Sequence, residues 1–369
     1  MSDGLGTPIQ GVTLYSFTRA FHARQYDLEG LIRRVSADGY GPGLEVIGFS
    51  AFRGFPDVTD EYAEWFRGLV DDAGLVQTSL AINTDVGIRR DRLMTDTELV
   101  EYMRRQIESA AKLGFPLARV QISLTPDSME RLLPIAERYG VTLAIEVHAH
   151  HHGKSDLVLA LRDRYEKLGS PLLGFVADWG ATVSEFAPSA VEAYRRRGAS
   201  EDLISAAVSL WRDYYRQGPP NTDSEHGERF GAFIGLAARH GRPDLGVDLA
   251  INGTGLWGPA EVSSWLEIMP WIRHVHGKFF GIDEHGEEPS VPVRGLVTQL
   301  VNAGYKGAIS TEYEGWHWNY WGDAFPIVAA EQAVQRSAAG FAGSRMVTSA
   351  AEAREQLSAH HDSARRPVQ

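Results

Sequence analysis

A regular alternation of short apolar runs with amphipathic helical segments constrains this chain most. The runs are rich in Val, Ile, Leu and Ala, which is typical of strands buried on both faces of a parallel sheet. Eight strand and helix units in succession predict an α/β fold, the closed parallel (β/α)8 barrel. The predicted strands are GVTLYSFT from Gly11, GLEVIGF from Gly43, VQTSLAIN from Val76, ARVQIS from Ala118, VTLAIEVH from Val141, LGFVADWG from Leu173, RHVHGKFF from Arg273 and GAISTEYE from Gly307.

Two of the segments between these strands begin with helix start signals. Thr95 and Glu98 have the spacing of a capping box at the start of DTELVEYMRRQIESAAKLG. Asp127 and Glu130 have the same spacing in DSMERLLPIAERYG. We therefore expect helices that begin at Thr95 and Asp127.

The chain is longer than a plain barrel, since it has 369 residues and a barrel of this type typically needs about 250. We expect a single catalytic barrel domain at residues 8–342, with a helical insertion at about 181–244 between strands six and seven. A C-terminal helix or tail at 343–369 is expected to fray after Arg345. A ninth run, LGVDLAIN at 245–252, is predicted as a strand outside the barrel; the alternative is a shifted strand count. Aromatic residues such as Trp211 and Tyr215 favour a docking surface over a lid for the insertion.

Composition excludes several classes of function. Lys and Arg total 36 against 48 Asp and Glu, and the net charge of −12 disfavours nucleic acid and anionic membranes as partners. The absence of cysteine excludes disulfides, thiolate metal sites and a cysteine nucleophile. No apolar run approaches the roughly 20 residues of a membrane span, and the first residues lack the zones of a secretory signal. We expect a cytoplasmic protein.

Polar side chains gather where four of the predicted strands end, and the active site of a (β/α)8 barrel lies at these carboxyl ends. Alternate residues of a strand share a face, so the pairs on one strand point the same way. Carboxylate oxygens with one imidazole suit a divalent ion such as Mn²⁺, Mg²⁺, Co²⁺ or Zn²⁺. The candidates are Glu146 and His148 on strand five, Asp178 on strand six, His274 and His276 on strand seven, and Glu312 and Glu314 on strand eight.

The motifs IEVH, VADWG, IRHVHGKFF and ISTEYEG resemble the xylose-isomerase-like TIM barrel superfamily. With MPWIRHVHGKFF and EGWHWNYW, most of residues 8–340 look most like the large (α) subunits of bacterial C-glycoside deglycosidases. The resemblance implies one divalent ion, most often Mn²⁺. Its implied ligands are Glu146, Asp178, His276 and Glu312.

Two alternatives stay open within this ligand set. His276 is preferred to His274 because the family's valine, histidine, any residue, lysine motif matches the stretch that ends at Lys278. The long insertion leaves Asp248 as a rival for the role of Asp178.

The resemblance also implies an acid/base role for His148, and imidazole is suited to proton transfer near neutral pH. Lys278 shares the inward face of strand seven, where it could polarise an enolate or simply pair with nearby carboxylates. His274, Trp316 and Trp318 are predicted substrate contacts, although the two aromatics could instead be packing residues.

Three functions are compatible with these residues. The resemblance implies a metal-dependent lyase that cleaves oxidised (3-keto) C-glycosides with aromatic aglycones by enolate formation and elimination, in a hetero-oligomer with a small β subunit. The same site could serve a sugar or keto-sugar isomerase, epimerase or dehydratase. A glycosidase without metal would use Glu146 and Glu312, with their carboxyl groups about 5 to 9.5 Å apart.

Overall fold

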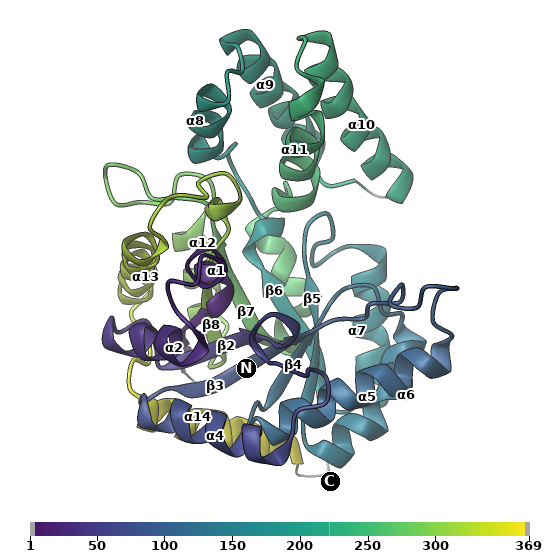
Figure 1. The fold of residues 1–369 in the computed structure, drawn as a ribbon, viewed down its shortest axis with the longest axis vertical. Helices are drawn as coiled ribbons and strands as arrows, with labels where there is room; N and C mark the ends of the chain where they lie inside the picture. Colours follow the sequence, from purple (N-terminus) through teal and green to yellow (C-terminus); the bar gives the residue numbers. More distant parts are fainter. Residues whose placement is uncertain (1–3, 221, 366–369) are drawn as a thin grey trace.

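The computed structural model describes residues 4–220 and 222–365, and in this part of the chain eight parallel strands close into a barrel (Figure 1). Each strand pairs with the next in sequence, and β8 returns to β1 through pairs such as Gly11 with Ser310. The predicted (β/α)8 barrel is confirmed. Its strands are β1 (Ile9–Thr13), β2 (Gly43–Ile47), β3 (Val76–Ile82), β4 (Leu117–Val120), β5 (Thr142–Val147), β6 (Leu173–Asp178), β7 (Ile272–Phe279) and β8 (Ala308–Tyr313).

Helices surround the barrel and cover its outer face (Figure 1). No helix in the described residues is long and apolar enough to cross a membrane. The longer surrounding helices are α2 (Leu28–Ala37), α4 (Asp60–Asp72), α5 (Asp96–Lys112), α6 (Pro126–Tyr139), α7 (Asp156–Leu168), α12 (Val293–Asn302) and α13 (Ala324–Phe341). Short helical turns follow several strands, namely η1 (Leu14–Phe17), α1 (Thr18–His22), α3 (Gly48–Ala51), η2 (Trp179–Ala181) and η6 (Gly315–His317), and η5 (Val262–Trp271) precedes β7.

The helix start signals are confirmed at one of the two predicted positions. Thr95 caps α5 with both halves of the capping box, since the side chain of Glu98 also returns to the backbone of Thr95. The predicted start at Asp127 is wrong by two residues, because Thr125 caps α6 and accepts a hydrogen bond from the N–H of Ser128. Pro126 occupies the first helical turn, where its missing N–H has no intrahelical partner to lose.

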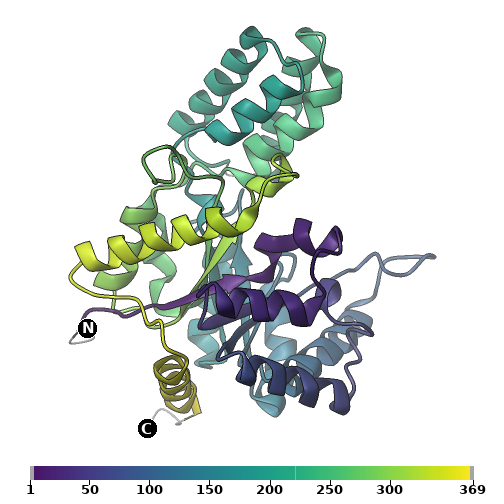
Figure 2. The same ribbon diagram turned by 60° about the vertical axis from the view of Figure 1, so that its left-hand side comes forward.

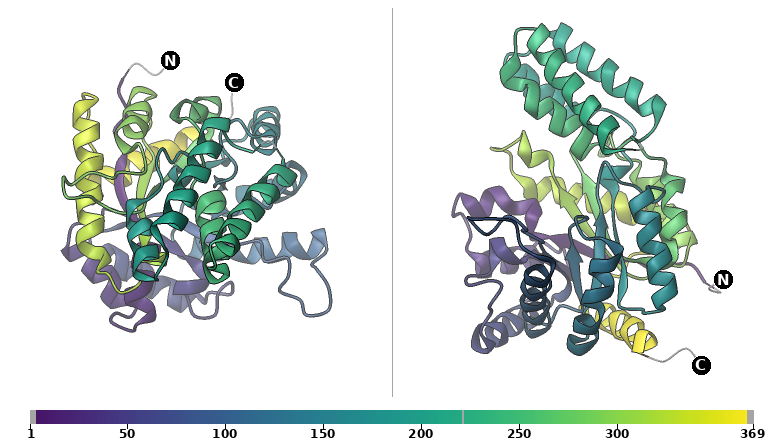
Figure 3. Two further views of the ribbon diagram at one scale, coloured as in Figure 1. Left: turned by 90° about the horizontal axis from the view of Figure 1, so that it is seen from above. Right: turned by 90° about the vertical axis from the view of Figure 1, so that its right-hand side faces the viewer.

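The insertion stands over the carboxyl ends of the strands as a separate group of helices (Figures 1 and 3). It contains α8 (Pro188–Arg196), α9 (Glu201–Gln217), α10 (Asp223–Arg239), η3 (Pro243–Leu245), α11 (Gly246–Ala250) and the π-helix η4 (Ile251–Leu256). Its two ends meet in an antiparallel bridge between Thr182 and Pro259, and the N–H of Val183 donates to the carbonyl of Gly258 at 2.8 Å. The insertion therefore extends beyond the predicted end at 244.

The predicted ninth strand is wrong, because LGVDLAIN forms the end of η3, all of α11 and the start of η4. The spacing of its buried residues is helical: Leu245, Leu249 and Ala250 are buried, whereas Val247 is 52% exposed. A strand would have buried Val247 and Leu249 on one face. Tertiary packing against α10 decides for the helix.

Aromatic side chains of the insertion build its own core. Trp211 is buried, and its ring lies edge-on to that of Phe186 with the ring centroids 6.4 Å apart. The ring centroids of Phe186 and Trp257 are 4.5 Å apart. Only Tyr215 of this group is substantially exposed. The expected docking role of Trp211 is thus replaced by a packing role.

The amino-terminal end of the barrel is closed by the C-terminal segment (Figure 2). Val347 bridges to Ile9, and both pack with Val76, Ala308 and Ala353. Helix α14 (Ala350–Arg365) follows, at the opposite end of the molecule from the insertion. The expected C-terminal helix is present, and fraying is not seen from Met346 to Ala353, where this segment covers apolar strand ends. Residues 366–369 of the expected tail lie outside the described residues.

Candidate metal centre

His276 lies at the centre of a buried ionic cluster inside the barrel. Its Nδ1 is 2.7 Å from Glu146 Oε1, 3.5 Å from Glu312 Oε2 and 4.0 Å from Asp178 Oδ2. Burial alone would lower the pKa of His276, but the carboxylates of Glu45, Glu312 and Glu146 outweigh it and raise that pKa well above its ordinary value. β5, β6, β7 and β8 therefore bring all four predicted metal ligands to one nitrogen atom.

Asp178 has one oxygen held by the backbone and one that faces the cluster. Its Oδ1 accepts a hydrogen bond from the N–H of Gly180 at 2.7 Å, in the turn η2 that follows β6. Gly180 is required here, since an added Cβ would lie 2.8 Å from Lys278 Cδ and 2.9 Å from the carbonyl oxygen of Leu256. The turn thus leaves Asp178 Oδ2 directed at Lys278 and His276.

Lys278 is fully buried among carboxylates. Its Nζ is 2.7 Å from Asp178 Oδ2, 3.3 Å from Glu314 Oε2 and 3.7 Å from Glu312 Oε2. Burial opposes its charge, but Asp178, Glu314 and Glu312 outweigh burial and raise the pKa of Lys278 well above its ordinary value. The side chain is therefore a fixed cation and hydrogen-bond donor at neutral pH.

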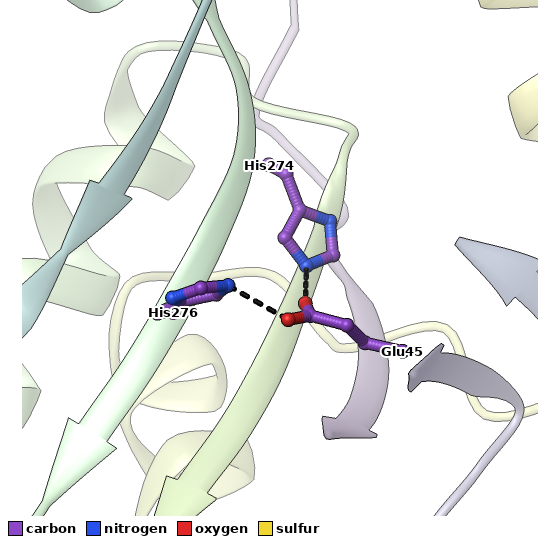
Figure 4. Close-up of side chains that lie close together, drawn as sticks. All are labelled: Glu45, His274 and His276. Carbon is purple, nitrogen blue, oxygen red and sulfur yellow. Dashed lines mark hydrogen bonds and ion pairs between the residues drawn. The ribbon is translucent and has the colours of Figure 1, made fainter. Parts of the chain in front are cut away.

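Glu45 of β2 holds the two histidines of β7 (Figure 4). Its carboxylate receives His274 Nε2 at 2.7 Å and lies 2.9 Å from His276 Nε2. Burial would raise the pKa of Glu45, but His276 and His274 keep it below its ordinary value. Because Nε2 of His276 faces Glu45, its Nδ1 is the nitrogen that faces the carboxylates of β5, β6 and β8.

Arg119 of β4 completes the charged wall, with Nε 3.7 Å from Glu146 Oε1. Burial would raise the pKa of Glu146, but Arg119 and His276 outweigh it and lower that pKa well below its ordinary value. Burial raises the pKa of Glu312 to about 8, although Lys278 and His276 oppose this. The cluster contains more carboxylates than permanent cations.

The donor set fits a divalent cation. In the described residues, Glu146, Asp178 and His276 form one of two groups whose ligand atoms lie within 4.8 Å of one another; the other is Glu45, His274 and His276. Asp178 Oδ2 and Glu312 Oε2 are buried without a hydrogen bond among these residues, and Lys278 Nζ lies 2.7 and 3.7 Å from them. Such atoms are costly to bury unless a cation compensates them.

His148 stands beside this group at the end of β5, with a partly exposed side chain. Its Nδ1 is 2.8 Å from the carbonyl oxygen of Ala149, an arrangement that places the hydrogen on Nδ1. Its Nε2 is 3.8 Å from Asp178 Oδ2. This tautomer leaves the lone pair of Nε2 facing the cluster.

The remaining predicted site residues lie in different surroundings. His274 is buried between Glu45 and Ser310, with Nε2 2.9 Å from Ser310 Oγ. Trp316 follows β8 and packs edge-on against Tyr15 at 5.3 Å. Trp318 donates from Nε1 to Ser189 Oγ at 3.1 Å, so it packs against the insertion.

The structure removes Asp248 as a rival ligand, since it lies on α11 and pairs with Arg197 at the surface. Trp179, which directly follows Asp178, is buried in the hydrophobic core.

Sequence reasoning missed Glu45, Arg119 and Tyr15. Glu45 and Arg119 are single charged residues inside the apolar strands GLEVI and LARV, a pattern that marks a paired or metal-linked buried charge. The sequence prediction used only the last positions of strands five to eight, so it did not include Glu45 or Arg119. Tyr15 lies in η1 after β1, where the sequence predicted a continuing strand.

Comparison with known proteins gives the family. The chain is 72% identical over 357 residues to a C-glycoside deglycosidase alpha subunit from Arthrobacter globiformis, covering 96% of this chain and 97% of that protein. The chain belongs to the C-glycoside deglycosidase alpha-subunit family. The chain is also 47% identical over 332 residues to a 3'-dehydrocarminate deglycosidase alpha subunit from Microbacterium sp, with 90% of this chain and 95% of that protein covered.

Broader similarities agree with this alpha-subunit family. The family model described as Xylose isomerase-like TIM barrel matches residues 43–206. The solved xylose isomerase domain protein from Planctomyces limnophilus matches with a TM-score of 0.50 and 13% identity, covering 92% of this chain and 99% of that chain. This likeness supports the fold alone. The motifs of this chain predicted that it resembles the deglycosidase alpha subunits, and the comparison confirms this.

Proposed function

We propose that this chain is the catalytic subunit of an enzyme that cleaves the C-glycosidic bond of oxidised, 3-keto C-glycosides. The supporting relatives are named C-glycoside deglycosidase alpha subunits, and one is named for a 3'-dehydro substrate. The name alpha subunit implies a partner subunit, which we propose to be a small β subunit in a hetero-oligomer. The observation that carries the proposal is the buried group Glu146, Asp178 and His276 with His148 beside it.

We further propose that Glu146, Asp178, His276 and Glu312 hold a divalent metal ion, with Mn²⁺ the first choice. The oxygen-rich set with one imidazole suits Mn²⁺, Mg²⁺, Co²⁺ or Zn²⁺. When bound, such an ion would act as a Lewis acid that acidifies the carbon next to a chelated ketone. His276 would contribute Nδ1, because its Nε2 faces Glu45 at 2.9 Å.

His148 is the proposed acid/base. With its hydrogen on Nδ1 directed at Ala149, Nε2 accepts the proton of the carbon between the keto group and the glycosidic carbon. The electron pair left on the sugar then forms a carbon–carbon double bond and expels the aglycone. His148 returns the same proton to the aglycone carbon, so the products are the free aglycone and an unsaturated keto sugar.

Lys278 is proposed to stabilise the negative charge that develops on the keto oxygen. Its raised pKa keeps it protonated, so it donates and does not act as a base. His274 is buried, and its Nε2 lies 2.7 Å from Glu45 Oε2 and 2.9 Å from Ser310 Oγ. We therefore reassign His274 from substrate contact to a positioning residue for β7.

The decisive test is incubation of the metal-loaded chain, with its partner subunit, and a 3-keto C-glucoside. Free aglycone is the expected product. Recovery of an isomerised or epimerised keto sugar with the aglycone attached would instead favour the isomerase class. Cleavage that survives complete chelation would contradict the metal and favour a glycosidase that uses Glu146 and Glu312.

A further inference from the structure

An apolar cavity of about 200 Å³ lies at the same end of the barrel as the ionic cluster. Leu14 and Tyr15 follow β1, Ile47 ends β2, and Trp316 follows β8. Phe21, Leu28 and Leu31 of α1 and α2 form its outer wall, and Phe49 and Ala51 of α3 its rim. The cavity therefore opens where the first, second and eighth strands end, on the other side of the barrel mouth from β5 and β6.

Two aromatic rings line this cavity at the ends of β1 and β8, and β8 also carries Glu312 of the ionic cluster. Tyr15 and Trp316 meet edge-on at 5.3 Å, and the Tyr15 hydroxyl lies 3.0 Å from His317 Nε2. Burial raises the pKa of Tyr15, and the carboxylates of Glu314 and Glu312 raise it further. Tyr15 thus lies within electrostatic reach of the charged residues while its ring lines the apolar space.

The hydroxyl groups of Thr18 and Ser50 in the lining do not need hydrogen-bond acceptors on a ligand. The hydroxyl of Thr18 donates to the carbonyl of Tyr15 at 2.7 Å, and the hydroxyl of Ser50 donates to that of Ile47 at 3.2 Å. Both hydroxyl hydrogens are therefore engaged with backbone. An engineered apolar cavity of about 150 Å³ binds benzene, so a space of about 200 Å³ accommodates roughly one aromatic ring with small substituents.

We propose that this cavity binds the aromatic ring of the aglycone next to the bond that is cleaved. The inference rests on the proposed function, because it assumes that the sugar lies over the carboxylates of β5 to β8. A glycoside with its sugar there must direct its aglycone to another part of the mouth, and the apolar side formed by β1 and β2 is complementary to a flat ring. Aglycones with several rings would extend past Phe49, which is 61% exposed.

Filling the cavity from its rim tests the assignment. Ala51→Trp places a large ring in the space from a partly buried position on α3. Ala111→Trp on α5 is the matched control, since Ala111 is also partly buried against the core but lies on the outside of the barrel. Thermal unfolding first establishes that both variants are folded.

Kinetics are then measured for each folded variant with its partner subunit and metal. For a phenyl-type 3-keto C-glycoside, Ala51→Trp should raise KM about tenfold or more, because the ring loses its apolar surface. For methyl 3-keto-glucoside, which has no ring to bind, KM should be unchanged. An equal rise for both substrates, or for neither, would overturn the assignment.

Binding of phenol to the metal-loaded full chain, measured by calorimetry, separates this inference from the proposed function. Wild type should bind phenol, and Ala51→Trp should not. If no keto glycoside is cleaved but this difference in phenol binding holds, the proposed function fails and the aromatic site stands. If glycosides are cleaved and phenol binds both proteins equally, the cavity assignment fails alone. Phe49→Ala, with the 87% exposed Phe341→Ala as control, repeats the test should Ala51→Trp not fold.

Discussion

The barrel mouth and the insertion use the same charged residue types in opposite ways. At the mouth, Asp178, Lys278 and Glu45 are fully buried, and each has at least two ionisable neighbours within 4.0 Å. In the insertion, pairs such as Arg195 with Glu201 are exposed on both sides. Exposed pairs contribute little to stability, whereas buried charges are costly unless they are compensated. The contrast indicates that the mouth retains its charges for chemistry and the insertion for solubility.

A comparison of Asp178→Asn with Asp248→Asn tests this contrast, and it has the largest expected effect. Asp178→Asn removes the charge of a proposed ligand from the buried group, so metal affinity should fall by more than the roughly 100-fold seen for outer-shell changes, and activity should be lost. Asp248→Asn removes only a surface partner of Arg197 and should leave both unchanged. Metal content after dialysis and the rate of aglycone release are the measurements. Equal metal content in the two variants would exclude Asp178 as a ligand.

The comparison of His148→Ala with His226→Ala should show the next largest difference. Loss of a general acid/base typically reduces kcat by about 10² to 10⁴, while bound metal should be retained because His148 is not a proposed ligand. His226 of α10 stacks on His150 at 3.9 Å, and its removal should change kcat only slightly. Metal analysis accompanies the kinetics, and loss of the ion from His148→Ala would make that residue a ligand.

Glu45→Gln tests whether Glu45 positions the two histidines of β7, and its expected effect is smaller. The amide keeps the shape of the side chain but not the charge that holds His274 and His276, so metal affinity should fall by about 10 to 100-fold. The matched control is Glu331→Gln on α13, a buried carboxyl whose pKa is raised well above its ordinary value by burial. Glu331 accepts a hydrogen bond from Gln335 Nε2 at 3.1 Å on the same helix, and its replacement should leave metal affinity unchanged in a competition titration with a chelator.

The contact between the insertion and the barrel should show a modest pH dependence. Burial lowers the pKa values of His150 and His226. His151 lowers the pKa of His150 further, His150 and Arg229 lower that of His226 further, and Asp223 opposes both shifts. These histidines bind protons more readily in the unfolded chain, so stability is present above the ordinary histidine pKa of about 6.5 and falls as the pH drops below it. Urea unfolding at pH 5 and pH 7.5 measures the difference. His226→Gln should reduce it, and an unchanged difference would contradict this origin.

Much of the fold could be predicted because barrel strands are buried on both faces. The runs ending at Asp178 and Glu312 therefore stand out from the helices around them. The candidate ligands of strands five to eight could be placed together because parallel strands end at one edge of the barrel. The choice of Glu146, Asp178, His276 and Glu312 among them came from the family resemblance. The same local pattern failed at 245–252, where packing on α10 overrides the strand-like alternation. Glu45 could not be paired with His274 from sequence, because that contact needs the curvature of the closed barrel across 229 residues.

The paired ends of the insertion make it separable from the enzyme that carries it. Gly258 donates its N–H to the carbonyl of Gly180 at 2.7 Å, and Ala260 donates to that of Ala181 at 3.0 Å. Chain entry and exit are thus adjacent, so a short turn could join them without altering β6 or β7. The position is accordingly a natural grafting point, at which whole helical modules can be exchanged during evolution or by design while the barrel keeps its register.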